Sequence, residues 1–214
     1  MIKRYGAVFG LLFGFGLVLG VPGSVWAHHA MGGEVPTDWW GGLMSGLAHP
    51  MVGLDHLSFV VAIGLVSVGQ WRGFWLPLVF VLSSIAGTGV HLQGWDLAGV
   101  EVMVSASVLI FGLILVVKYW LGELVGSVGG SMVLALLGAI AGVCHGYAYG
   151  EAIVGAGMLP LIAYLVGFGM IQLMIALGVY GVVRSLGVLP RWLPVAGLAI
   201  AGLGVSSVWQ VVAG

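Results

Sequence analysis

The sequence predicts an all-α membrane protein: a single bundle of about six membrane-spanning helices after a cleaved N-terminal signal peptide. Of the 214 residues, 61% are hydrophobic and only 6% are charged, whereas about 25% are charged in a typical soluble domain. Apolar runs close to the roughly 20 residues that cross a bilayer recur along the chain. The 39 glycines favour closely packed membrane helices. The single cysteine, Cys144, excludes an internal disulfide.

Residues 1–27 have the layout of a secretory signal peptide. Lys3 and Arg4 form a short basic start, an apolar stretch follows to about residue 21, and a cleavage site then ends at Ala27. The mature chain, residues 28–214, would be one transmembrane domain that begins with His28 and His29 outside the cytoplasm. An uncleaved signal anchor is the alternative.

Six further spans are expected, over residues 51–70, 73–92, 97–118, 130–149, 159–184 and 192–213. If the mature N-terminus lies outside the cytoplasm, the basic residues near the span ends all fall on the inner side: Arg72, Lys118, Arg184 and Arg191. This distribution satisfies the positive-inside rule, and the opposite orientation would violate it. We therefore expect a multi-pass protein of the cell (inner) membrane.

The histidines and most of the carboxylates gather at the opposite, outer end of the predicted bundle. Only Glu123 is an acid on the inner side. The candidate site residues at the outer end are His49, Asp55, His56, His91, Glu101, His145 and Glu151. Ionisable residues inside membrane spans are costly and commonly mark a functional site.

The first group of these residues is the run from His49 to His56. Pro50 suits the first position of a helix, which would place His49 at the cap. In a straight helix His49 and His56 share a face but lie about 10 Å apart along the axis. One ion could bind both only if the helix is broken or another span supplies ligands. Asp55 would be a ligand or would orient His56. The alternative is a capping histidine with an Asp–His pair at the membrane interface.

The second group lies at the end of the fourth span. Glycines recur every four residues over 138–150 and form a bare stripe that permits close helix packing. His145 lies beside this stripe and is expected to face the bundle interior, with Glu151 just beyond it. The alternative is a hydrogen-bonded belt of His145 and its neighbouring tyrosines.

Other residues complete the predicted ligand set. His91 and Glu101 come from consecutive spans joined by a short outer loop, so they should reach the same level. We expect His49, Asp55, His56, His91 and His145 to bind a metal ion, supported by Glu101, Glu151, His28 and His29. Imidazole and carboxylate together suit Ni²⁺, Co²⁺ and Zn²⁺, and the ligand types do not choose among them.

These motifs resemble the HupE/UreJ family of nickel and cobalt permeases. The run HPMVGLDH at residues 49–56 matches that family's HPxxGxDH signature. His91, the run HGYA at residues 145–148, the signal peptide and the six spans support the resemblance, which covers most of the chain. Many members read HGxAHGxE in the fourth span, whereas here Tyr149 takes the place of the second histidine and Glu151 comes one residue early.

The resemblance implies a secondary permease that takes up Ni²⁺ or Co²⁺ for metalloenzymes such as hydrogenase or urease. Carried onto this sequence, it makes His49, Asp55 and His56 the functional core, with His145 in support. The expected partners are the metal ion and membrane lipid. A net charge of −1 gives no indication of nucleic acid, and a homo-oligomer is left open.

Three other classes compete with a non-enzymatic permease. An intramembrane zinc-dependent hydrolase would also use histidines and an acid, although the sequence has neither an HExxH nor a GxSxG motif. A non-transporting metal-binding or assembly subunit of a membrane complex is favoured by the scarcity of polar side chains in the inner half. A bis-histidine haem carrier is a weaker alternative.

Overall fold

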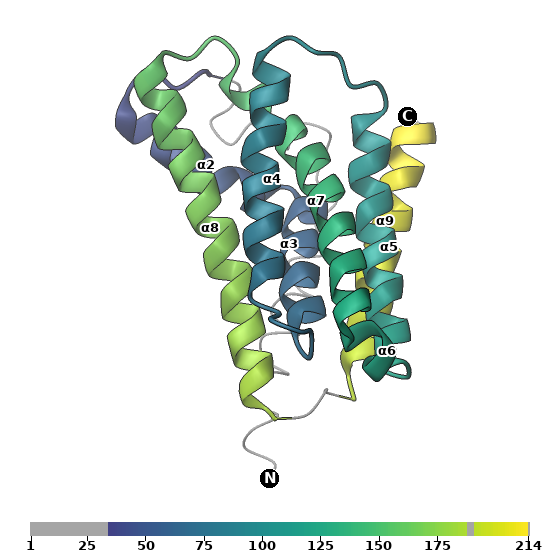
Figure 1. Cartoon of the computed structure of the whole chain (residues 1–214). Coiled ribbons are helices and arrows are strands. Elements are labelled where there is room, and N and C mark those ends of the chain that lie inside the picture. The colour runs from purple at the N-terminus through teal and green to yellow at the C-terminus, as the bar shows by residue number, and fades with distance from the viewer. Residues whose placement is uncertain (1–33, 188–190, 214) are drawn as a thin grey trace.

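Helices account for most of the chain that the computed structural model describes, residues 34–187 and 191–213 (Figure 1). In chain order the helices are α2 (Trp39–Val52), α3 (Leu54–Ser67), α4 (Trp75–Leu92), α5 (Val100–Lys118), α6 (Gly122–Gly126), α7 (Val128–Gly150), the 3-10 turn η2 (Glu151–Ile153), α8 (Met158–Ser185) and α9 (Leu193–Ala213). Within these residues, five helices are long and apolar enough to cross a membrane, or six spans if α2 and α3 count as one. The all-α, multi-span prediction is therefore confirmed. The predicted signal peptide, with His28 and His29, lies outside the described residues.

The last five predicted spans agree with α4, α5, α7, α8 and α9 to within three residues at either end. The first span differs from its prediction. Helix α2 begins twelve residues earlier than predicted, where the Asp38 carboxylate caps it by accepting the backbone N–H of Gly41 at 2.7 Å. Pro50 lies in the last turn of α2, not at the start of a helix. The predicted start at residue 51 is therefore wrong: Asp38 caps the helix much earlier, and Pro50 is accommodated in its last turn.

A sharp break at Gly53 separates α2 from α3, and their axes differ in direction by 81°. Gly53 has extended backbone angles (φ −78°, ψ 114°), and the nearby Pro50 has no N–H with which to continue the helical hydrogen bonding. Helix α3 has 14 residues and is therefore about 21 Å long, shorter than the roughly 30 Å hydrocarbon core of a bilayer. Helix α3 by itself is therefore too short to cross the bilayer.

Helix α3 forms the centre of the bundle. Figure 1 shows it behind α4 and α7, with α8 on one side and α5 and α9 on the other. Ten of its residues are buried, among them Phe59, Ile63 and Val66. Such a helix is apolar all round because protein covers it on every side. The residues at its two ends are therefore held in fixed positions by the surrounding helices.

Glycine contacts hold the surrounding helices close together in pairs. Along α7, Gly142 and Gly146 face α4, and a Cβ at Gly142 would lie only 2.6 Å from the carbonyl oxygen of Phe80. The Thr88 hydroxyl of α4 also donates to the carbonyl of Gly146 at 2.7 Å. The predicted bare stripe on the fourth span is thus confirmed, and its partner is α4. Glycines permit the same close approach between α5 and α9 and between α2 and α8.

One end of the bundle, which we call the basic end, carries the described basic residues: Arg72, Lys118, Arg184 and Arg191. Lys118 is 1% exposed, and its ammonium group donates a hydrogen bond to the carbonyl of Val66 in the last turn of α3. A lysine in this position satisfies a carbonyl that the helix end leaves without an intrahelical donor. Which side of the membrane the basic end faces stays a prediction from the positive-inside rule.

The α4–α7 contact predicts that Gly146→Ala destabilises the protein. The added Cβ would overlap the carbonyl oxygen of Ser84, and overpacking of this kind costs about 1–3 kcal/mol or more. Gly178→Ala on α8 is the matched control, because nothing lies within 4 Å of its Cβ position. Thermal unfolding of the detergent-solubilised protein, followed by circular dichroism, should show a lower midpoint for Gly146→Ala only. Equal midpoints would contradict the tight contact.

Candidate functional site

The break between α2 and α3 brings together histidines from three helices. His49 lies in the last turn of α2, His56 in the first turn of α3, and His145 in α7. All three are buried, with 6%, 3% and 0% of their surfaces exposed. The ring centroids of His49 and His56 are 6.4 Å apart, although a straight helix would separate them by about 10 Å along its axis. The broken helix therefore satisfies the condition under which both could reach one ion.

Gly53 at the break leaves room for the side chains of Asp55 and His56. A Cβ at this position would lie 2.8 Å from Cδ2 of His56 and 2.9 Å from Oδ1 of Asp55. The Asp55 carboxylate accepts the backbone N–H of His56 at 2.8 Å in the first turn of α3, where the helix dipole favours a negative charge. Asp55 thus lies beside His56 and is only partly buried.

A chain of hydrogen bonds fixes the tautomers of two of these histidines. The Ser107 hydroxyl of α5 donates its one proton to the carbonyl of Val104 at 2.7 Å. His145 must then donate from Nε2 to the Ser107 oxygen, at 2.9 Å, which leaves its Nδ1 as an acceptor. His56 consequently donates from Nδ1 to Nδ1 of His145 at 2.8 Å. In the neutral state, His56 therefore has its lone pair on Nε2.

His145 supports His56 in this arrangement. Both of its ring nitrogens are used in hydrogen bonds to His56 and Ser107, and its ring stacks on Phe59 at 4.4 Å between centroids. A hydrogen bond to the second nitrogen of a ligating histidine orients that ligand and raises its basicity. His145 can become a direct metal ligand only by giving up one of these hydrogen bonds.

Tyr149 is a further member of the site, although the sequence indicates it only as a departure from the family pattern. Its ring is fully buried and lies 5.1 Å from the ring of His49 and 4.6 Å from that of His56. Its hydroxyl has no hydrogen-bond partner among the described residues. Tyr149 follows His145 by one helical turn, and this spacing is the signal that could have placed it on the same face. We refer to His49, His56, His145 and Tyr149 as the histidine cluster.

His91 does not belong to the histidine cluster and packs elsewhere against α7. It is partly buried in the last turn of α4, where its ring lies 4.5 Å from that of Tyr147 and its Cβ lies 2.7 Å from the Cβ position of Gly150. The Tyr147 hydroxyl donates to the carbonyl of Trp95 at 2.8 Å and so ties α7 to the loop after α4. His91 therefore faces the α4–α7 contact at the end of the bundle opposite the basic end.

The predicted supporting acids are also apart from the cluster. Glu101 is partly exposed in the first turn of α5, and Glu151 is exposed in η2. Within residues 34–187 and 191–213, no group of three or more His, Cys, Asp and Glu side chains is arranged to hold a metal ion. The full ligand set predicted from the sequence is thus not assembled in this conformation.

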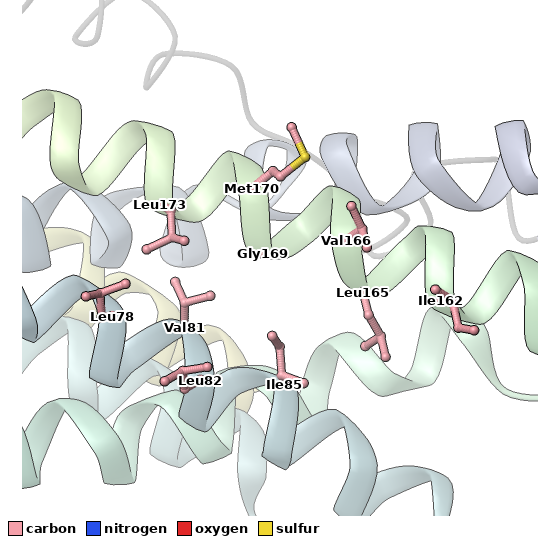
Figure 2. Close-up of a pocket in the computed structure, with 10 residues that line it drawn as sticks. All are labelled: Leu78, Val81, Leu82, Ile85, Ile162, Leu165, Val166, Gly169, Met170 and Leu173. Carbon is pink, nitrogen blue, oxygen red and sulfur yellow. The ribbon is translucent and has the colours of Figure 1, made fainter.

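A groove of about 360 Å³ opens between α4 and α8 (Figure 2). Its lining is entirely apolar: Leu78, Val81, Leu82, Ile85, Ile162, Leu165, Val166, Gly169, Met170 and Leu173. Such a surface suits hydrocarbon, and it offers no ligand to a cation. The histidine cluster, not this groove, is therefore the candidate site.

A membrane bundle with a broken helix and ionisable side chains at the break has the architecture of a secondary transporter. The comparison with protein families identifies which kind. The profile described as HupE / UreJ protein matches residues 16–207, so this chain belongs to the HupE/UreJ family. The members of this family are nickel and cobalt uptake permeases and not enzymes. Membership confirms the resemblance and sets aside the hydrolase alternative.

A curated relative supports this assignment. The chain is 28% identical over 111 residues to Protein HupE of Rhizobium leguminosarum bv. viciae. The match covers 51% of this chain and 54% of the relative, so the chain spans about half the length of that protein. No solved structure matches the chain.

The hydrogen-bond chain predicts the tautomers of two histidines in the metal-free protein. Nitrogen-15 NMR of histidine-labelled protein should show His56 protonated at Nδ1 and His145 at Nε2. Ser107→Ala removes the acceptor for His145 and should shift the ring resonances of both histidines. Ser206→Ala, at an exposed position on α9, should leave them unchanged. A proton on Nε2 of neutral His56 would contradict the assignment.

Proposed function

We propose that this protein takes up a divalent transition-metal ion, Ni²⁺ or Co²⁺, through a site formed by His49, Asp55 and His56. The main support is the pair of buried imidazoles on either side of the helix break. Nitrogen–metal bonds of 2.0–2.1 Å give two imidazoles on one ion a centroid separation of about 6.5 Å at most, reached only when they bind on opposite sides of the ion. The separation of the His49 and His56 rings is 6.4 Å. Any other coordination geometry requires the two rings to move closer together.

Each residue of the proposed site has a distinct role. His56 binds through the Nε2 lone pair, while His145 holds its Nδ1–H at 2.8 Å and fixes the ring. His49 supplies the second imidazole. Asp55 supplies a negative charge next to the break, and this charge lowers the cost of bringing a divalent ion into the membrane. Zn²⁺ suits the same ligands and is the competing ion.

The ion approaches from the end of the bundle opposite the basic end. His91 lies there with a buried Nδ1 that has no hydrogen-bond partner among the described residues. Glu101 and Glu151 add negative charge at the same end. His28 and His29, which lie outside the described residues, would add imidazoles if the signal peptide is cleaved after Ala27. By the positive-inside rule this end faces outward.

The proposed site predicts that His56→Ala abolishes tight metal binding. Purified protein in detergent should be titrated with Ni²⁺, Co²⁺, Zn²⁺ and Cu²⁺ and assayed for uptake after reconstitution into liposomes. His145→Phe keeps a ring of similar shape but loses the orienting hydrogen bond, and should weaken binding about 10- to 100-fold. Gly178→Ala should behave as wild type. Binding by His56→Ala at wild-type strength would exclude the proposed site, while binding without uptake by the wild type would favour the non-transporting subunit.

Tyr149→His restores the imidazole that many family members carry at this position. Because the Tyr149 ring contacts both His49 and His56, an imidazole there adds a nitrogen ligand and should tighten Ni²⁺ binding about tenfold or more. Tyr149→Phe is the control, since it keeps the ring and removes only the hydroxyl. Equal Ni²⁺ affinity of Tyr149→His and Tyr149→Phe would show that position 149 contributes no ligand.

A further inference from the structure

Gln172 is a fully buried polar side chain in the middle of α8. It is 0% exposed, and neither the nitrogen nor the oxygen of its amide has a hydrogen-bond partner among the described residues. Leaving a buried polar group without a partner costs about 1–3 kcal/mol. An apolar residue of the same size would avoid this cost, so packing alone does not account for a glutamine here.

The neighbours of Gln172 on its helix place it relative to the histidine cluster. Phe168, Gln172 and Ala176 follow one another at four-residue intervals and so share a face of α8. The ring of Phe168 lies 5.5 Å from that of Tyr149, a member of the cluster. The carbonyl of Ala176 lies 2.6 Å from the Cβ position of Gly64 on α3. Gln172 therefore lies on the face of α8 that follows α3, about 6 Å along the axis beyond Phe168 in the direction of the basic end.

Buried serines of α3 and α4, by contrast, are satisfied. The hydroxyls of Ser58, Ser67 and Ser84 donate to the carbonyls of Asp55, Ile63 and Phe80. Each of these bonds stays within its own helix, as is common for serine in membrane helices. Gln172 thus differs from these serines. Its amide oxygen, between the histidine cluster and the basic end, remains available to a ligand.

We propose that the Gln172 amide oxygen is a second binding station for the metal ion, which it contacts after leaving the histidine cluster. This inference rests on the proposed function. A divalent ion cannot cross an apolar region without oxygen ligands or water. A single neutral carbonyl oxygen is a weaker ligand for Ni²⁺ or Co²⁺ than imidazole. Weak binding at an intermediate station lets the ion leave again, as conduction requires.

Gln172→Leu tests this station, because leucine removes the amide and keeps an apolar side chain of similar size. Metal binding to detergent-solubilised protein should stay at wild-type affinity, since the histidine cluster is intact. Uptake of Ni²⁺ into liposomes should fall about tenfold to a hundredfold, the effect expected for losing a polar contact to a charged group. Gln210→Leu makes the same change at an exposed position of α9 and should transport as wild type.

Three outcomes would overturn the proposal. Uptake by Gln172→Leu at the wild-type rate would make Gln172 a packing residue, and a higher unfolding midpoint should accompany it because the unpartnered amide is gone. If Gln172→Leu lost both metal binding and uptake, Gln172 would belong to the same site as the histidine cluster. If the leucine variant does not fold, Gln172→Met tests the station again. Uptake by Gln172→Met at the wild-type rate would likewise make Gln172 a packing residue.

Gln172→His gives a positive test of the same station. An imidazole at position 172 is a stronger ligand than an amide, so the variant should hold one more metal ion per chain than the wild type and release it slowly, with reduced uptake. An unchanged number of bound ions would contradict the station. Failure of the wild type itself to bind metal would instead contradict the proposed function, so the two failures are distinguishable.

Discussion

The break in the first membrane segment is the constraint on which the candidate site depends. A continuous helix through Gly53 would leave His49 and His56 two turns apart. The 81° change of direction between α2 and α3 instead accompanies a ring-centroid distance of 6.4 Å between them. Irregular backbone inside a membrane is tolerated only where protein or a polar cavity surrounds it. Here α8 packs along α2 and also against α3, and it therefore covers both arms of the broken helix. The cost of the break is met by the packing around it.

The glycine contacts explain how a bundle with so few polar side chains holds this geometry. Lipid is as apolar as the helix surfaces, so hydrophobicity gives little drive for one membrane helix to associate with another. Close backbone approach supplies dispersion contacts in its place. Gly46 on α2 and Gly167 on α8 bring the first arm onto α8, with the Cβ position of Gly167 only 2.5 Å from the Leu43 carbonyl oxygen. Backbone packing of α2 against α8 thus helps to set the position of His49.

Buried polar groups in the bundle fall into two sets. Most are satisfied within the protein, such as His145 with Ser107 and Thr88 with the Gly146 carbonyl. Others keep unpartnered atoms in the described structure, among them the Tyr149 hydroxyl and both amide atoms of Gln172. In a medium without water, satisfied groups make the structure rigid, whereas unpartnered ones are sites where a ligand gains most by binding. In the second set, Tyr149 belongs to the histidine cluster on α7, and Gln172 lies on α8.

The sequence by itself determined the membrane class, the last five spans, the glycine stripe and the residue types of the site, because hydropathy, glycine spacing and buried charge depend on local composition. It also singled out His49, Asp55, His56 and His145. Only the tertiary structure decided that the first span is broken, that His145 bonds to His56 and Ser107, that His91 lies apart and that Tyr149 and Gln172 face the interior. These features depend on which helices pack side by side and at what angle, and contacts between residues as distant as His56 and His145 leave no local pattern in the chain.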